Sequence, residues 1–596
     1  MTEYKQKKWD LSDVLEATEG QKFDSFLADL NKKVSQFETL RTNLGHLSRE
    51  DVAGAVRLEE DITASAIRLI SYAQMRFTEN TSSQEAKAFL DKAEDIMTEM
   101  QNKRLFLKLW WLGLDEKTAS DLLPENTDHR FYLTKMRKLT SHTLDEKVEQ
   151  AINLKNITSE SAWSDLYDQV TNGFSYVLKI DGKTEKDGKG KSKKFTEGEL
   201  LSLFQSTNPK KRRAAYHAIL SKNAENGDLL GAIYMNVVRD WSNENLKLRN
   251  YSSPISSRNM KNGISDSAID ALLSSCRKNV GAFQDFFKLK AKLLGVDKLS
   301  RYDIYAPTTK SDKKFRYSDG VNLVLDVFQE FDPKFSELAR KIFDSDHVDS
   351  EIRPGKQSGA YNMNVGPNIV PFIKLNYTGR VRDVFTVAHE SGHGINALLA
   401  SSHSVLTQNP GLPMAETASI LGEMVMSEKL MDRENDDKVK TELLVDRLGD
   451  LYATIQRQAY FVLFENAAHE AVAKGATTKE LCDLYMSNLK EQFGDSLSEI
   501  PDEFRWEWSM IPHIYHTPFY CYAYSFGGLL TLSLYKKYKE EGESFKPKIL
   551  GILAAGGSET PENILKKTGI DINSQEFWDG GFDIVRGLVD KLKSLN

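Results

Sequence analysis

The sequence predicts a mainly α-helical fold with one small β-sheet, and three observations lead to that class. Gly and Pro number only 36 and 15 among 596 residues, a share below the roughly 12% of average proteins, and few chain breakers favour long helices. Apolar residues recur at steps of three and four through much of the chain, which is the period of an amphipathic helix. Apolar residues make up 40% and charged residues 28% of the chain, which predicts a globular protein with a sizeable core.

Charge, cysteine content and the N-terminus limit the partners and the compartment. The net charge of −7 at pH 7 argues against nucleic acid or an anionic membrane as the main partner. The three cysteines, Cys276, Cys482 and Cys521, are too few and too scattered for a disulfide framework and indicate free thiols. The charged start lacks a secretion signal, and no run approaches the roughly 20 apolar residues of a spanning helix. We therefore expect a cytoplasmic protein without a nucleic-acid or membrane partner.

The first two hundred residues are predicted to be a helical region that ends in a hairpin. Helical periodicity runs from about residue 24 to 172. Residues 176–181 alternate apolar and polar side chains, a Gly- and Lys-rich stretch follows, and Phe195 resumes the apolar pattern. This pattern predicts a β-hairpin near 176–196 with a solvated basic loop.

A second change of pattern falls in the middle of the chain. The helical pattern restarts at about residue 207, but extended segments bracketed by Gly and Pro occupy 355–377, and residues 372–377 are strand-like. They predict a small sheet immediately before a helix at 381–400. No repeat or sharp break in composition divides the chain, so we place only a soft boundary between an N-terminal region, 1–200, and a C-terminal region, 201–596.

The helix at 381–400 contains the most informative motif, His389-Glu390-Ser391-Gly392-His393. Histidines four residues apart project from one face of a helix, so both imidazoles are placed to bind one cation, and nitrogen ligands suit Zn²⁺. Glu390 lies beside that metal as a carboxylate able to accept a proton from the attacking water. An accidental pair of surface histidines is the alternative.

A catalytic zinc usually has three protein ligands, so the third must come from elsewhere. Glu416 and Glu423 are seven residues apart on the next predicted helix and share a face. One of them is expected to bind the metal while the other orients a ligand histidine. The alternative is that they are carboxylates on the solvent-facing side of a helix. His403 is a further candidate, but Ser401-Ser402 beside it suggests that the helix ends there.

At this point the sequence resembles the M3 family of zinc oligopeptidases, in its oligoendopeptidase F branch. The motif at 389–393 followed by Ala415-Glu416-Thr417-Ala418-Ser419 is similar to the metal-binding pattern of that family. Further similarities extend over nearly the whole chain, at residues 9–13, 353–361, 457–465 and 556–561. Ser391 departs from the pattern where an apolar residue is usual, and Asn396 where a further histidine commonly follows.

The resemblance has implications for the ligands and the fold. It implies that Glu416 is the third ligand of one Zn²⁺ per chain, with Glu423 in an orienting role. It implies a large two-lobed helical fold of the zincin type with a deep substrate cleft and the small sheet beside the metal-binding helix. Residues 201–596 then form the catalytic M3-like domain.

A segment rich in histidine and tyrosine follows much later, at residues 513–524. Peptide hydrolysis passes through an oxyanion, which phenols and imidazoles stabilise by donating hydrogen bonds. His513 and Tyr522 are the predicted stabilisers, and the resemblance supports this assignment. Weaker candidates for substrate contact are Tyr515, His516, Tyr520 and Tyr524. Aromatic packing is the competing interpretation for some of these tyrosines.

These inferences predict a zinc endopeptidase that cleaves short peptides. Glu390 is the general base, and the strand region near Tyr361 to Asn364 is predicted to bind the substrate main chain as an added strand, with Gly359 and Tyr361 as candidate contacts. A metallocarboxypeptidase is the first alternative. It would need a cationic side chain to bind the terminal carboxylate of the substrate, and the sequence does not show where the candidates Arg353, Lys356 and Arg505 lie. A non-catalytic peptide-binding scaffold is the second. The sequence leaves the cleavage preference and the oligomeric state open.

Overall fold

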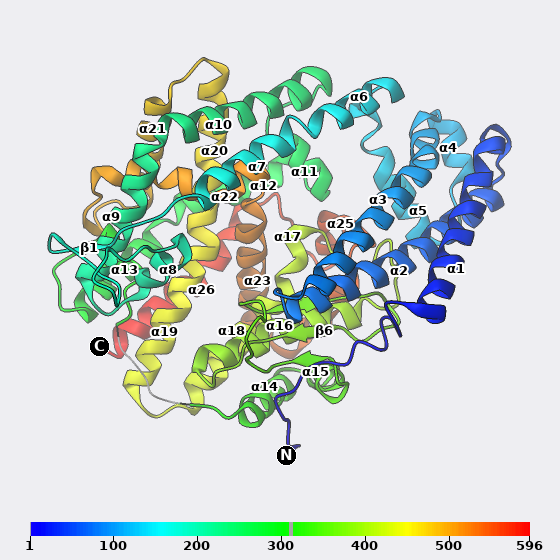
Figure 1. Cartoon of the computed structure of the whole chain (residues 1–596). Coiled ribbons are helices and arrows are strands. Elements are labelled where there is room, and N and C mark those ends of the chain that lie inside the picture. The colour runs from blue at the N-terminus through cyan, green and yellow to red at the C-terminus, as the bar shows by residue number, and fades with distance from the viewer. Residues whose placement is uncertain (1, 309–313) are drawn as a thin grey trace. The chain divides into compact units, whose positions relative to one another are not determined.

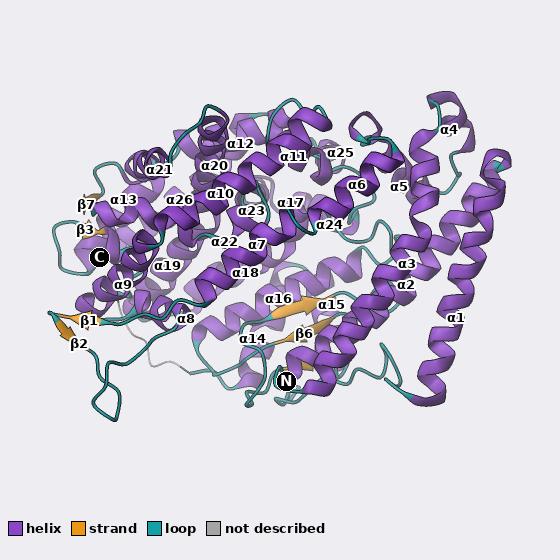
Figure 2. Ribbon diagram, turned by 45° about the horizontal axis from the view of Figure 1, so that its top comes forward, coloured by secondary structure: helices purple, strands orange, loops and turns teal. Residues whose placement is uncertain are grey.

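The computed structural model describes residues 2–308 and 314–596. Figures 1 and 2 show many helices with a few short strands between them, which confirms the mainly α-helical class. By internal contacts the chain divides into two compact units, each built from three stretches: Met1–Ser141, Asp312–Leu430 and Lys537–Asp571 in unit 1, and His142–Ser311, Met431–Lys536 and Ile572–Asn596 in unit 2. The division into sequence regions near residue 200 stays a prediction.

Unit 1 contains the predicted metal helix and the small sheet. Its helices are α1 (Gly20–Thr39), α2 (Arg49–Glu79), α3 (Gln84–Gly113), α4 (Glu116–Leu122), α5 (Thr127–Arg137), α14 (Tyr317–Phe331), α15 (Pro333–Asp344), α16 (Val381–Leu399), α17 (Leu412–Ala415), α24 (Lys546–Ala554) and α25 (Pro561–Lys566). Two helices belong partly to each unit, α18 (Thr417–Arg433) and α23 (Tyr522–Glu541).

Unit 2 is also helical. Its helices are α6 (Glu146–Asn156), α7 (Glu160–Asn172), α8 (Glu197–Ser202), α9 (Pro209–Glu225), α10 (Gly227–Trp241), α11 (Ser256–Asn262), α12 (Asp266–Lys278), α13 (Gly281–Leu293), α19 (Asp437–Leu451), α20 (Arg457–Ala473), α21 (Thr478–Phe493), α22 (Pro512–His516) and α26 (Gln575–Ser594). Strands β3 (Leu299–Ser300) and β7 (Leu497–Glu499) pair in parallel within this unit.

Local sequence explains how the long helices of unit 1 begin and pack. Ser48 caps α2 by accepting a hydrogen bond from the amide of Asp51 at 3.2 Å, and the Asp51 carboxylate accepts one from the amide of Ser48 at 2.9 Å. Such a capping box satisfies donors that the first helical turn leaves open. The apolar face of α2 then joins Trp9 and Phe372 in one buried cluster, so the N-terminal segment, α2 and the sheet share a core.

The small sheet has three strands in the order β4-β6-β5: β4 (Val348–Asp349), β6 (Phe372–Lys374) and β5 (Tyr361–Met363). β4 is parallel to β6, and β5 is antiparallel to β6. The N-terminal segment covers the outer side of β4, because the amide of Ser350 donates to the carbonyl of Lys7 at 3.0 Å and the amide of Asp10 donates to the carbonyl of Asp346 at 2.7 Å. β5 forms the other edge of the sheet, and among the described residues no backbone hydrogen bond joins Asn362 to a further segment.

The predicted hairpin is present, but it turns earlier than expected. β1 (Lys179–Ile180) pairs with β2 (Lys183–Thr184) across Asp181 and Gly182. Both turn residues have positive φ, 49° and 75°, which a two-residue turn of this twist requires. The lysine-rich stretch follows the turn, and a bridge between Tyr176 and Phe195 closes the excursion as predicted.

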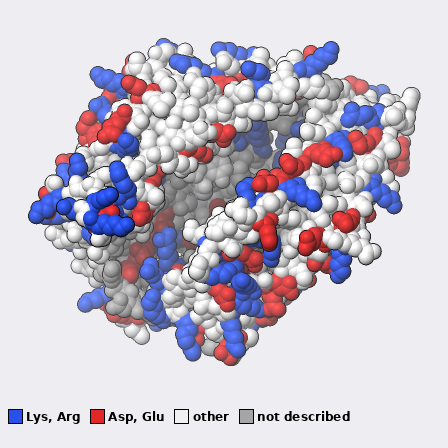
Figure 3. Space-filling view, viewed as in Figure 1, with Lys and Arg blue, Asp and Glu red and all other residues white. Residues whose placement is uncertain are grey.

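The surface and the helices give two general findings. On the face shown in Figure 3, Lys and Arg side chains are interspersed with Asp and Glu, and neither sign forms a continuous field. Within residues 2–308 and 314–596, no helix combines the length and the apolar character needed to cross a bilayer.

Candidate metal centre

The metal-binding helix α16 begins where the sequence predicts. The Asp383 carboxylate accepts hydrogen bonds from the amides of Thr378 and Arg380, at 2.7 and 3.0 Å, and so satisfies donors at the start of the helix. Val384, Ala388 and Ile395 are buried along it. This packing anchors the helix, and the four-residue spacing then sets His389 and His393 on a common face.

Two glycines allow α16 and α18 to cross at close range. A Cβ atom on Gly392 would lie 2.5 Å from the carbonyl oxygen of Ala418, and one on Gly422 would lie 3.0 Å from that of Ala388. The first distance is shorter than any real contact between a methyl group and backbone. Gly392 therefore permits the approach that brings the segment containing Glu416 to the two histidines.

Three donor atoms converge at this crossing. The Nε2 atoms of His389 and His393 are 3.2 Å apart, and each lies 3.5 Å from Oε2 of Glu416. Glu416 is not inside one continuous helix as predicted. It occupies the break between α17 and α18, with φ −84° and ψ −1°. Ser419 donates a hydrogen bond of 2.8 Å to Oε2 of Glu416, which fixes the carboxylate toward the histidines.

Glu423 contacts the opposite side of the His389 ring. Its Oε1 lies 2.7 Å from Nδ1 of His389, so this nitrogen carries the proton and Nε2 is left as the ligand atom. Burial opposes protonation of the ring, but the hydrogen bond and the charge of Glu423 outweigh it and raise the pKa of His389 to about 9, so a metal that binds Nε2 has to displace a proton from it. For His393, burial lowers the pKa to about 4, which keeps that imidazole neutral.

Glu390 lies between the two histidines in the sequence, and its side chain points away from solvent. Its side chain is buried, with the residue 6% exposed. Burial raises the pKa of Glu390 to about 7, with His389 acting in the opposite direction. A carboxylate with a pKa near neutrality is well matched to accepting a proton and returning it.

The donor set fits a zinc ion. Two imidazole nitrogens and one carboxylate oxygen, all within 4.8 Å of one another, form the three-ligand set that leaves a position open for substrate or water. His403 is not part of it, because α16 ends at Leu399 and Nδ1 of His403 lies 3.0 Å from Asp128. His403 therefore lies outside the donor set, beyond the end of the helix.

The histidine- and tyrosine-rich segment belongs to unit 2 and separates into two groups. The rings of His513, Tyr520 and Tyr524 pack together with centroids 5.4 to 5.9 Å apart. Tyr522 does not join them. It is fully buried, and its hydroxyl accepts a hydrogen bond of 2.6 Å from Asn262. Of the two predicted stabilisers, only His513 lies in the ring cluster.

The remaining candidates of this segment have structural contacts. Tyr515 is buried and stacks on Tyr167 with the centroids 3.9 Å apart, as the competing packing interpretation proposed. Nε2 of His516 lies 2.9 Å from the carboxylate of Asp168. Neither residue is in ring contact with His513.

The cations considered as a carboxylate clamp are already paired. Arg353 and Lys356 both bind the buried Asp349, at 2.6 and 2.8 Å. Arg505 pairs with Asp483 and Asp502. A carboxypeptidase that used one of these three cations would first have to break an existing ion pair.

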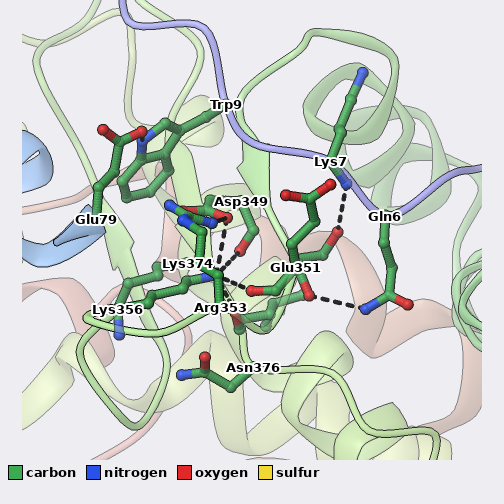
Figure 4. A network of polar contacts seen from close by, with 12 residues as sticks. Gln6, Lys7, Trp9, Glu79, Asp349, Glu351, Arg353, Lys356, Lys374 and Asn376 are labelled. Atoms are coloured by element: carbon green, nitrogen blue, oxygen red, sulfur yellow. Dashed lines mark hydrogen bonds and ion pairs between the residues drawn. The ribbon is translucent and has the colours of Figure 1, made fainter.

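The residues near the sheet occupy distinct positions. Gly359 lies in the exposed loop before β5, with φ +76°. The ring of Tyr361 packs toward the core, where its hydroxyl lies 2.5 Å from Oγ1 of Thr78, so its phenol does not point to a ligand. The sequence analysis did not single out Lys374, although a lysine within the otherwise apolar strand 372–375 indicates that polar partners bind its ammonium group. Figure 4 shows Lys374 beside the charged group around Asp349.

A helix with two histidines around a buried glutamate, completed by a carboxylate as the third ligand, defines a metal-dependent hydrolase. Comparison with known proteins identifies which kind. The description "Peptidase family M3" matches residues 202–584, and "Oligopeptidase F" matches residues 110–176. The chain belongs to peptidase family M3, in its oligopeptidase F branch, and is a metallopeptidase that hydrolyses peptides.

Individual relatives cover nearly the whole chain. It is 26% identical to an oligoendopeptidase F homolog of Lactococcus lactis subsp. lactis, over 98% of this chain and 97% of the relative. It is 25% identical to the oligopeptidase PepF of Bacillus subtilis, over 92% and 81%. The crystal structure of oligoendopeptidase-F from Enterococcus faecium has a TM-score of 0.72 at 20% identity, over 96% of this chain and 98% of that one. At that identity the structure establishes the fold alone.

Proposed function

We propose that this protein is a single-zinc endopeptidase that cleaves internal bonds of short, unstructured peptides. The observation that carries the proposal is the convergence of His389, His393 and Glu416 beside the buried Glu390. The names of the relatives support the endopeptidase activity and the preference for oligopeptides.

Each residue of the centre has a distinct task. Zinc bound by His389, His393 and Glu416 supplies Lewis-acid chemistry, which acidifies water and polarises a carbonyl. Glu390 accepts the proton of the attacking water and delivers it to the leaving amine. Glu423 holds the His389 ring in the orientation that binding requires.

The carbonyl oxygen becomes an anion during attack, and donors from the ring cluster around His513 are proposed to stabilise it. Within the described residues the ring nitrogens of His513 have no hydrogen-bond partner. Tyr524 and Tyr520 pack against it. The Tyr522 hydroxyl accepts from Asn262 and still has its own proton to donate, but the side chain is fully buried and lies outside the ring cluster, so we place His513 before it.

The substrate main chain is proposed to pair with the open edge of β5. The amides of Ile373 and Leu375 donate to residues of the β4 side, so the backbone groups of Phe372 and Lys374 point toward β5, where they pair with Met363 and Tyr361. Because successive residues of a strand alternate direction, the amide and carbonyl of Asn362 face outward. An extended peptide added here would be bound through its main chain and not through particular side chains.

One experiment tests the function directly. The purified protein is analysed for zinc and incubated with internally quenched peptides whose two ends are blocked, and the products are mapped by mass spectrometry. Cleavage at internal bonds by a protein with one zinc per chain is expected. Cleavage only of peptides with free C-termini, one residue at a time, would instead establish the carboxypeptidase.

A further inference from the structure

One residue of the histidine- and tyrosine-rich segment has a backbone conformation that its side chain disfavours. Phe519 has φ +60°, in the left-handed region, which is unusual for a bulky residue. Within the described residues, the other positive φ values outside glycine belong to Asp181 and Asn250, and Asp and Asn tolerate this region. Strain of this kind persists only where the surrounding structure enforces it, and it is common at functional sites.

The strained residue lies in a tight turn between α22 and α23. The amide of Tyr520 donates to the carbonyl of Thr517 at 3.1 Å, so residues 517–520 form a four-residue turn with Pro518 second and Phe519 third. Proline second and a positive φ third is the pattern of a type II turn, whose third position normally needs glycine or asparagine. A type I turn has the central peptide rotated and a negative φ at the third residue. A phenylalanine at this position by itself therefore favours type I.

Two side chains hold the central peptide of the turn from opposite sides. Oε1 of Glu465, on α20, accepts a hydrogen bond from the amide of Phe519 at 2.8 Å. Nε of Arg258, on α11, donates to the carbonyl of Pro518 at 3.2 Å. The C=O and N–H of a trans peptide point in opposite directions, so the two side chains lie on opposite sides of it. Rotation of this peptide to the type I form would turn both groups away from their partners.

The contact with Glu465 is shielded from water. The Glu465 side chain is fully buried, and burial raises its pKa to about 8, although the bond from Phe519 and the charge of Arg258 act in the opposite direction. The carboxyl group thus keeps its proton at neutral pH and serves as a neutral acceptor. The Phe519 ring is also buried and packs on His469 with the centroids 4.6 Å apart, so a favourable side-chain position accompanies the strained backbone.

The turn joins the two parts of the ring cluster formed by His513, Tyr520 and Tyr524. His513 lies before the turn, and its carbonyl accepts from the amide of Thr517 at 2.8 Å. Tyr520 directly follows the strained residue, and its ring stacks on that of His513 with the centroids 5.9 Å apart. Rotation of the central peptide changes the direction in which the chain leaves the turn, and with it the position of the Tyr520 ring relative to His513.

We propose that Glu465 and Arg258 are positioning residues, which hold the peptide between Pro518 and Phe519 in its strained orientation and thereby place the rings of the cluster for catalysis. Both act through the backbone of the turn and not by contact with the substrate. The proposal rests on the proposed function, in which donors of this cluster stabilise the oxyanion. It accounts for a phenylalanine where a type II turn normally has glycine.

The test compares Glu465→Leu with Glu465→Gln. Leucine is apolar and has no acceptor, whereas glutamine keeps an oxygen that accepts from the Phe519 amide and matches the shape of the protonated carboxyl group. Arg258→Met removes the donor on the other side of the peptide. Glu470→Leu is the control, because Glu470 is an exposed carboxylate on the same helix that pairs with Lys474.

Each variant is measured for kcat, KM, zinc content and unfolding temperature, with the kinetics recorded well below the lowest unfolding temperature. Crystal structures of the variants report φ of residue 519. The charges that act on the pKa of Glu390 belong to the metal centre and to Lys374, so these substitutions leave the general base unaltered.

In Glu465→Leu we expect kcat to fall about 10- to 100-fold, because small displacements of catalytic groups reduce the rate by this order, while KM and zinc content change little. Residue 519 should then have a negative φ. Glu465→Gln should retain both kcat and the positive φ, and this rescue separates the loss of the acceptor from a general loss of stability. Arg258→Met should lower kcat by less, and Glu470→Leu should change neither quantity.

Three results would overturn the proposal. They are an unchanged kcat in folded, zinc-loaded Glu465→Leu, a lowered kcat with φ of residue 519 still positive, and a Glu465→Gln variant as impaired as Glu465→Leu. If Glu465→Leu does not fold, kcat and φ of residue 519 in Arg258→Met decide in the same way. Failure of the proposed function is distinct, because it would appear as absence of peptide hydrolysis by the unaltered protein, while φ of residue 519 in the variants can still be measured.

Discussion

Oε1 of Glu423 lies 2.7 Å from Nδ1 of His389, and this contact orders the metal centre. It fixes the tautomer of the ring, so Nε2 faces Nε2 of His393 and the carboxylate of Glu416. Spacing alone left Glu416 and Glu423 interchangeable on one helix face, and the resemblance to the M3 family gave the ligand role to Glu416. The break before α18 distinguishes them, because it turns Glu416 into the donor cluster and leaves Glu423 behind the ring.

Glu390→Gln should retain zinc but lose turnover. The amide is close in shape to the carboxylate but cannot accept a proton, and loss of a general base typically costs about a hundredfold or more. Zinc stoichiometry and kcat are measured on the same preparation. Near-normal activity in the zinc-replete variant would remove Glu390 from the mechanism.

Glu416→Ala and Glu423→Ala should differ in kind. The first removes one of three ligands, so zinc and activity should be lost together. The second removes only the partner of His389, and zinc affinity should fall about 10- to 100-fold while saturating zinc restores activity. Titration with a competing chelator measures both. Stoichiometric zinc in Glu416→Ala would require a different third ligand.

Gly392→Ala should damage the centre through packing alone. The added Cβ would lie 2.5 Å from the carbonyl oxygen of Ala418, so α16 and α18 must separate, and overpacking of this kind typically costs about 1–3 kcal/mol. We expect a lower unfolding temperature and weaker zinc binding. Gly449→Ala is the control, because a Cβ there meets nothing within 4 Å. Equal stability and zinc affinity of the two variants would contradict the close crossing.

His513→Ala and Tyr524→Phe should lower kcat more than they raise KM, because the proposed donors bind an oxygen that is fully anionic only in the transition state. Removing one such donor typically costs about 10²–10³ in kcat. Tyr522→Phe should have a smaller effect, since that side chain is fully buried and lies outside the ring cluster. If Tyr522→Phe is the most impaired variant, the prediction made from the sequence was right and the ranking from the ring cluster is wrong.

Native folded proteins should resist cleavage. A substrate that pairs with the edge of β5 must be extended, and a folded domain would first have to unfold, at a cost of about 5–15 kcal/mol. One good cleavage sequence is therefore presented as a free peptide and inside a stable domain. Comparable cleavage rates for the two would refute edge pairing as a requirement.

The sequence by itself determined the helical class, the placement of His389 and His393 on one helix face, and the position of Glu390 between them. These features depend on local spacing, because four residues make about one helical turn wherever the helix lies. It also placed the small sheet before α16. Only the tertiary structure decided that Glu416 lies at a break between two helices, that the hydroxyl of Tyr522 accepts a hydrogen bond from Asn262, and that Lys374 binds the loop at 357–359. Each of these features depends on a partner that folding brings close, and these partners lie from a few residues to more than 250 residues away in the sequence. The periodicity of a segment carries no information about which distant atoms it will contact.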